Sequence, residues 1–298
     1  MRLLRVTLTM SMLFACVLAQ GPARADTRIK VVASFTILAD FIRNVGGDRV
    51  DVVALVGPNA DAHVYTPSPG DAKTVAVARL VVVNGLGFEG WLPRLVKSSG
   101  GTARIAVATE GIDPLKEPPG GHHSVDPHAW QSVPNAKIYV ENIRRALTGI
   151  DPASAETYRA NAARYLVQLD ALDRDVRAMV AQIPEARRKV ISTHGAFGYF
   201  AAAYGVAFIA PQGVSTDTEP SARDLATIIG QIRKEEIPAV FLENISDPRL
   251  IRRVAAETGA KIGGTLYSDS LTDEKGATPT YIDMVRHNIK TLKDALDK

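Results

Sequence analysis

The sequence contains almost no cysteine. The single one, Cys16, lies in an N-terminal segment with the features of an export signal: two arginines precede an apolar core over 6–19, and Ala23-Arg24-Ala25 forms a cleavage site. Such a core is too short to span a bilayer. We therefore expect residues 1–25 to be a signal peptide. The mature chain then has no thiol, which excludes disulfides, thiol chemistry and cysteine-based metal sites.

Lipid anchoring is the alternative fate of this segment. Leu13-Phe14-Ala15-Cys16 loosely matches a lipoprotein cleavage site, but Phe14 is large for its position. We expect simple cleavage and a periplasmic protein, and lipoprotein anchoring through Cys16 is the less favoured alternative.

The mature chain also lacks net charge and long apolar runs. Removing Arg2, Arg5 and Arg24 from the 35 Lys and Arg residues leaves 32, which equals the 32 Asp and Glu residues. This balance argues against nucleic acid or an anionic membrane as the main partner. No later apolar run is long enough to span a bilayer. The remaining length suffices for two domains with their own cores.

What the sequence does contain is a strand-then-helix alternation that occurs in both halves. Residues 80–83 (Leu-Val-Val-Val) form a continuous apolar run, which is typical of a strand buried on both faces. Alternating strands and helices predict parallel sheets, and hence an α/β fold. We expect strands at 29–33, 50–56, 80–83, 104–108, 189–193, 206–209, 239–242 and 261–267, and helices at 37–45, 69–78, 91–97, 135–147, 221–236, 248–258 and 281–296.

One long segment divides the two halves. Residues 153–182 contain no glycine or proline, and apolar or small residues recur with gaps of four and three, as on one helical face. We favour a rigid strut between two lobes over a coiled coil. The expected domains are 1–25 (signal peptide), 26–150 (N-terminal α/β lobe), 151–184 (linking helix) and 185–298 (C-terminal α/β lobe). The helical face comprises Tyr158, Ala162, Tyr165, Leu169, Leu172, Val176, Met179 and Ile183.

Three histidines and one aspartate follow predicted strands. His194 ends a β-branched run before Gly195-Ala196, which we expect to open a helix whose N-terminus favours the neutral imidazole. Side chains at the carboxyl edge of a parallel sheet project into its crevice, so these residues converge if the lobes face each other. Three imidazoles and a carboxylate suit Zn²⁺. The candidate metal ligands are His63, His128, His194 and Asp269.

Each residue alone also has a simpler interpretation. His194 could be a buried histidine bonded to backbone, His63 and His128 could be loop or surface histidines, and Asp269 could cap a turn through its own backbone. The four are far apart in sequence, so their spacing does not specify a site.

Together, several motifs resemble the zinc and manganese receptors of ABC importers, a metal-specific family of extracytoplasmic solute-binding proteins. The resemblance covers the mature chain and implies two α/β lobes joined by one long helix, with the four residues named above as metal ligands between the lobes. It rests on His63-x-Tyr65, Val83-Asn84-Gly85…Glu89-x-Trp91, Asp126-Pro127-His128-x-Trp130, Thr193-His194-x-Ala196-Phe197-x-Tyr199-Phe200, Glu219-Pro220-Ser221 and Tyr267-Ser268-Asp269-Ser270.

Two positions depart from the family pattern. Thr66 stands where the family usually has an acid, so the support of His63 differs. The loop before His128 has only His122 and His123 where zinc receptors often carry a long histidine-rich insertion; these two could pass metal to the site, but we favour a solvated pair. Glu243 and Asp126 are candidates for orienting a ligand histidine, or are ordinary surface acids.

The resemblance implies a receptor that captures Zn²⁺ and delivers it to an ABC permease in the inner membrane. Imidazole at His194, where manganese receptors have a carboxylate, favours Zn²⁺, with Mn²⁺ as the alternative. A periplasmic metallochaperone is a further candidate partner. We expect a monomer and no nucleic-acid partner. Metal affinity should fall as the pH drops through 6 to 7, near the ordinary histidine pKa.

Two alternatives belong to other functional classes. A zinc hydrolase could use three histidines with Glu243 as general base, but a fourth ligand would close the site and the chain has no H-E-x-x-H helix. A surface adhesin rests only on analogy with lipidated relatives.

Overall fold

The computed structural model describes residues 28–117 and 125–297. The predicted signal peptide with Cys16, and the His122-His123 pair, lie outside the described residues. In the described part no helix is both long and apolar enough to pass through a bilayer.

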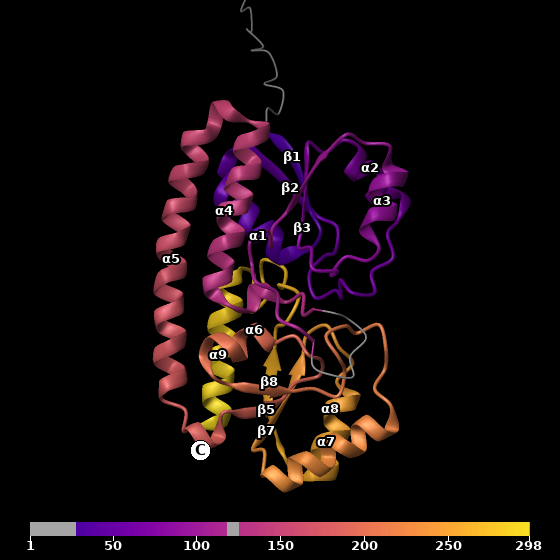
Figure 1. Cartoon of the computed structure of the whole chain (residues 1–298), viewed down its shortest axis with the longest axis vertical. Helices are drawn as coiled ribbons and strands as arrows, with labels where there is room; N and C mark the ends of the chain where they lie inside the picture. The colour runs from indigo at the N-terminus through magenta and orange to yellow at the C-terminus, as the bar shows by residue number, and fades with distance from the viewer. Residues whose placement is uncertain (1–27, 118–124, 298) are drawn as a thin grey trace, which may run out of the picture.

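The first half forms one α/β lobe around a sheet with strand order β2-β1-β3-β4, in which every pairing is parallel (Figure 1). All four residues of β3 are buried, as its apolar run predicts. The elements are β1 (Ile29–Ala33), α1 (Thr36–Gly46), β2 (Val50–Ala54), α2 (Pro69–Ala76), β3 (Leu80–Val83), α3 (Leu92–Ser99), β4 (Arg104–Val107) and α4 (Val133–Ile150).

The second half forms another lobe with the same architecture. Its sheet has the order β6-β5-β7-β8 and is again parallel throughout. The fold class predicted from the sequence is therefore confirmed. The elements are β5 (Lys189–Ile191), α6 (Gly198–Tyr204), β6 (Ala207–Ile209), α7 (Ala222–Glu235), β7 (Ala239–Glu243), α8 (Arg249–Thr258), β8 (Lys261–Leu266) and α9 (Tyr281–Leu296).

The predicted strut is α5 (Ala155–Ala181), a helix of 27 residues that runs along one side of both lobes in Figure 1. At 1.5 Å per residue it is about 40 Å long. It begins later than expected, because residues 152–154 form a 3₁₀ turn. The helix does not stand alone: α1 and α4 of the first lobe and α9 of the second pack against it. Its buried face is Tyr158, Ala162, Tyr165, Leu169, Leu172, Val176 and Val180.

A single hydrophobic core extends through both lobes. It includes Val81 of the first sheet, Leu169 of α5 and Phe241 of the second sheet. A smaller separate cluster lies between the second sheet and helices α7 and α8. A shared, densely packed core resists large hinge rotations, so the lobes are held in a fixed arrangement.

The sequence predicted the helix after β5 incorrectly. We expected it to open at Gly195-Ala196, but α6 begins at Gly198 with Phe197 as its N-cap. His194 is therefore not at the helix N-terminus. Its protonation is determined by neighbouring side chains instead, as described below.

Asp40 links three elements at the centre of the molecule. Its Oδ2 accepts hydrogen bonds from the backbone N–H of Tyr281 (3.1 Å), at the start of α9, and from the hydroxyl of Tyr165 (3.3 Å), on α5. Burial raises the pKa of this carboxyl to about 6, and the two hydrogen bonds only partly oppose that shift. The folded state thus favours the protonated carboxyl.

Replacing Asp40 with Asn should therefore change the pH dependence of stability. The folded pKa lies above the unfolded value of 3.8, so wild-type stability falls as the pH rises from 4 through 6. Asparagine keeps an acceptor oxygen and does not ionise. We expect Asp40→Asn to match wild type at pH 4 and to be more stable at pH 8, by about 1–3 kcal/mol.

Urea unfolding of the metal-free protein at both pH values measures this difference. Asp170→Asn, which removes an exposed carboxylate paired with Lys137, is the control and should gain no stability at pH 8. An Asp40→Asn variant that is less stable than wild type at pH 8 would show that the ionised carboxylate is needed.

Candidate metal centre

The structure brings all four candidate residues together between the lobes. His63 lies in the loop after β2, and His128 in the long connection between β4 and α4. His194 follows β5, and Asp269 follows β8. One donor atom from each lies within 4.8 Å of the others. The carboxyl edges of the two sheets thus place residues up to 206 positions apart at one point, as the βα topology predicts.

The separations of the donor atoms fit a bound metal ion. His128 Nε2 lies 3.2 Å from His63 Nε2 and 3.4 Å from His194 Nε2. Asp269 Oδ2 lies 3.2 Å from both His63 Nε2 and His194 Nε2, and Oδ1 lies 3.6 Å from His128 Nε2. Donors about 2.0–2.1 Å from a tetrahedral Zn²⁺ would be about 3.3 Å apart.

Asp269 provides a second test of fit. Both of its oxygens are buried. Although they lie close to imidazole nitrogens, neither accepts a well-aligned hydrogen bond from a described residue. A buried carboxylate without hydrogen bonds is costly unless a cation compensates it. Because both oxygens face imidazole nitrogens, this residue can offer a metal one donor atom or two.

Two of the histidines are oriented by buried carboxylates, Glu243 and Asp126, which the sequence offered either as orienting residues or as ordinary surface acids. Glu243, at the end of β7, accepts hydrogen bonds from the backbone N–H groups of Thr193 (2.7 Å) and His194 (3.0 Å), and its Oε2 lies 2.7 Å from His194 Nδ1. Asp126 Oδ1 accepts the backbone N–H of His128 at 2.9 Å and lies 2.8 Å from its Nδ1. These contacts point both Nε2 atoms at the site.

His63 is supported differently. Among the described residues none accepts a hydrogen bond from its Nδ1, and Thr66, which replaces the usual acid, is exposed. The edge of the Phe88 ring packs against its imidazole, with the ring centroids 4.7 Å apart. His63 is the only one of the four whose residue as a whole is half-buried, although its side chain is just 4% exposed.

The carboxylates also determine the protonation of the site. Burial lowers the pKa of His128, but the charges of Asp269 and Asp126 outweigh it and raise that pKa to about 9. Burial also lowers the pKa of His194, but the charges of Glu243 and Asp269 outweigh this effect and raise that pKa well above its usual value. The prediction of a neutral His194 is therefore wrong for the metal-free protein. Burial lowers the pKa of His63. Burial would raise the pKa of Asp269, but the positive charges of His128 and His194 hold it well below its usual value.

Sequence reasoning did not assign a role to Glu89. This buried carboxylate accepts hydrogen bonds from Ser34 Oγ and Asn84 N, both at 2.6 Å, and from Gly85 N at 3.2 Å. It thereby fixes the loop that carries Phe88 beside His63. The Glu89-x-Trp91 motif marked the position, but only the fold shows which backbone groups it binds.

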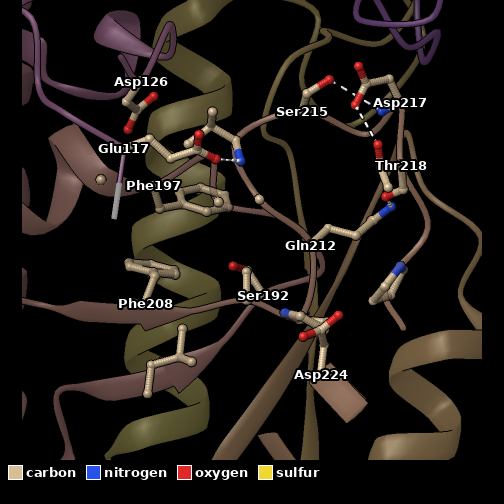
Figure 2. A pocket seen from close by; sticks show the side chains of 18 of the residues that line it. Glu117, Asp126, Ser192, Phe197, Phe208, Gln212, Ser215, Asp217, Thr218 and Asp224 are labelled. Carbon is tan, nitrogen blue, oxygen red and sulfur yellow. Dashed lines mark hydrogen bonds between the residues drawn. The ribbon is translucent and has the colours of Figure 1, made fainter. Parts of the chain in front are cut away.

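A cavity of about 670 Å³ adjoins the site (Figure 2). None of the four candidate residues lines it. Asp126, which orients His128, and Gly195, which follows His194, lie in its wall together with the connection between β6 and α7. Figure 2 shows Ser215, Asp217 and Thr218 of that connection on the opposite side of the cavity from Glu117 and Asp126. The cavity therefore adjoins the site at Asp126 and at the backbone after His194.

Comparison with known proteins agrees with this architecture. Residues 31–295 match the family described as ZnuA, "Zinc-uptake complex component A periplasmic". This chain belongs to that family. Its members are substrate-binding proteins of ABC transporters, which work with a membrane permease and an ATPase, so the protein is not an enzyme.

Known relatives are similar to this chain over nearly its whole length. The iron-binding protein YfeA of Yersinia pestis is 37% identical over 279 residues, which cover 93% of this chain and 89% of YfeA. The manganese-binding lipoprotein MntA of Halalkalibacterium halodurans is 34% identical over 279 residues, covering 93% and 92%. The solved structure of the periplasmic zinc-binding protein TroA from Treponema pallidum has a TM-score of 0.86 and 30% identity, covering 91% and 100%.

The raised histidine pKa values predict proton release on metal binding. The neighbouring carboxylates raise the pKa values of His128 and His194 and so favour protonated imidazoles at pH 7, whose protons a metal must displace. Affinity should therefore increase with pH up to about 9, above the window near 6 to 7 expected from the sequence. Isothermal titration with Zn²⁺ in buffers of different ionisation enthalpy should show about two protons released at pH 7.

Asp126→Asn should reduce that number, because it removes one of the charges that raise the His128 pKa. Release of no proton by the wild-type protein at pH 7 would contradict this account of the site.

Proposed function

We propose that this protein captures Zn²⁺ outside the cytoplasmic membrane and delivers it to an ABC permease, with His63, His128, His194 and Asp269 as the metal ligands. The observation that carries the proposal is the set of donor separations of 3.2–3.6 Å among three imidazole nitrogens and one carboxylate. Three nitrogen donors and one oxygen donor, all buried, suit Zn²⁺.

Mn²⁺ is the second candidate, and a specific feature favours it. Both oxygens of Asp269 face the site, so a fifth donor is available to a harder ion that prefers oxygen and a higher coordination number. The relatives compared above are named for iron, manganese and zinc, which supports a divalent transition metal without selecting one.

Mutation of His194 tests whether these residues bind the metal. His194→Ala should lower Zn²⁺ affinity by at least about 100-fold, because it removes a ligand and leaves Glu243 without its partner. Competition with a chromophoric chelator measures the affinity, and circular dichroism checks the metal-free fold. His287→Ala is the matched control, since this histidine bonds Thr265 O away from the site and should leave affinity unchanged. Equal effects of the two substitutions, or unchanged affinity in His194→Ala, would reject the assigned site.

Affinity alone does not identify the metal carried in the cell, because almost any such site binds Zn²⁺ more tightly than Mn²⁺. Elemental analysis of protein purified from its own compartment decides between them. We expect zinc to predominate; manganese at near one equivalent per chain would make Mn²⁺ the cargo.

The remaining expectations concern the surroundings of the protein. A periplasmic metallochaperone and a monomeric state stay predictions. MntA is named a lipoprotein, which favours anchoring through Cys16 against our expectation from Phe14, whereas TroA is named only as periplasmic.

Cell fractionation tests the anchoring. We expect wild-type protein in the membrane fraction and Cys16→Ala in the fraction released by osmotic shock. Equal release of the two proteins would show that the segment is simply cleaved and leaves no lipid anchor.

A further inference from the structure

Two of the three histidines, His63 and His128, follow an aspartate two positions earlier, and the two aspartates contact their histidines differently. Asp61-Ala62-His63 and Asp126-Pro127-His128 share an Asp-x-His pattern, and in both the aspartate accepts the backbone N–H of the histidine at 2.9 Å. Asp126 uses the same carboxylate to orient the imidazole of His128. Asp61 does not do so for His63.

The second carboxylate oxygen of Asp61, Oδ2, accepts a hydrogen bond from the second lobe instead. Thr216 Oγ1 donates a hydrogen bond to Asp61 Oδ2 at 2.5 Å, although the two residues are 155 positions apart. One carboxylate therefore connects the backbone of His63 to the β6–α7 connection of the second lobe. The second lobe also contacts the start of this loop, where Asn59 N donates to Leu271 O at 3.0 Å and Ser270 Oγ donates to Gly57 O at 3.3 Å. The Thr216 contact lies closer to His63 in sequence than either of these hydrogen bonds.

The β6–α7 connection also contacts the backbone on either side of His194. Gly195 N donates to Gly213 O at 2.9 Å, and Gln212 N donates to Thr193 O at 3.3 Å. Val214 N donates to Glu117 Oε1 at 3.2 Å, in the same β4–α4 connection that carries His128 eleven positions later. Residues 212–216 thus form a bridge between the backbone around His194 and two connections of the first lobe, one of which carries His63.

His63 depends on this bridge more than the other histidines do. Its Nε2 faces Asp269 as the other imidazoles do, but no described carboxylate orients its Nδ1, whereas Asp126 and Glu243 lie beside the Nδ1 atoms of His128 and His194. The shared core prevents a wide opening of the lobes, so metal must leave through a local movement of a ligand loop. His63 is the ligand whose imidazole no described carboxylate orients through Nδ1, so its loop is the one expected to move.

We propose that Thr216 is a positioning residue that holds the His63 loop closed through Asp61 and so sets the rate at which bound metal leaves. This inference rests on the proposed function, since it needs a metal bound at the site. Loss of the Thr216 hydroxyl frees one end of the Asp61 carboxylate. The His63 loop then separates from the second lobe more often, while the ligand set stays the same.

Thr216→Val tests the proposal because valine keeps the shape of threonine and removes only the hydroxyl. We expect the dissociation rate of Zn²⁺, measured by stopped-flow with excess chelator, to rise about tenfold. Thr218→Val is the matched control in the same connection, since the Thr218 hydroxyl donates only to the neighbouring Asp217 among the described residues. It should dissociate at the wild-type rate. Thr216→Ser restores the hydroxyl and should return the rate to near the wild-type value.

Two further measurements separate positioning from general destabilisation. The visible absorption spectrum of the Co²⁺-loaded Thr216→Val protein should match wild type, and its metal-free melting temperature should be unchanged. Equal dissociation rates in wild type and Thr216→Val, equal acceleration by Thr218→Val, or a lowered metal-free melting temperature without rescue by serine would overturn the proposal. If wild-type protein bound no metal, the proposed function itself would fail, which the wild-type titration shows independently.

Discussion

Negative charge buried between the lobes is the constraint on which this site depends. Asp126, Glu243 and Asp269 are each no more than 4% exposed, and all three face imidazoles. Buried carboxylates are tolerated only beside compensating positive charge. In the metal-free protein that charge is supplied by protons on His128 and His194, whose pKa values the carboxylates raise. A divalent ion replaces two protons with the same total charge. The site can therefore stay closed with the same net charge in both states.

The shared core determines how such a site can exchange its metal. Because α5 packs against helices of both lobes and one apolar cluster extends through the molecule, rotating the lobes apart would expose a densely packed interior. Local loop movement is much less costly. The three histidines are unequal in this respect: His128 and His194 are fixed by buried carboxylates, whereas His63 is held through its backbone and the edge of Phe88.

Regular features of the sequence predicted most of the fold. The apolar run of β3, the strand-helix alternation and the four-three spacing of α5 each reflect a local periodicity, and the convergence of the four residues follows from where parallel strands end. Protonation of His194 could not be predicted, since it depends on Glu243, which is 49 positions away, and on where α6 begins. The roles of Glu89 and Thr216 could not be predicted for the same reason, since their partners are specified by the tertiary structure; a motif marks the position of Glu89 but not the groups that it binds.

The metal that a protein of this architecture carries depends on how fast metal is released and which metals are available, as well as on the ligands. The intrinsic preference of nitrogen and oxygen donors for Zn²⁺ over Mn²⁺ and Fe²⁺ holds for any site of this kind, yet proteins of the same architecture are named for all three metals. A receptor must also release its cargo, so a site of maximal affinity would not serve transport. Weakening one ligand loop lets release be adjusted while three residues keep the ion in place. The unequal support of His63 is a physical means of doing so without changing a single donor atom.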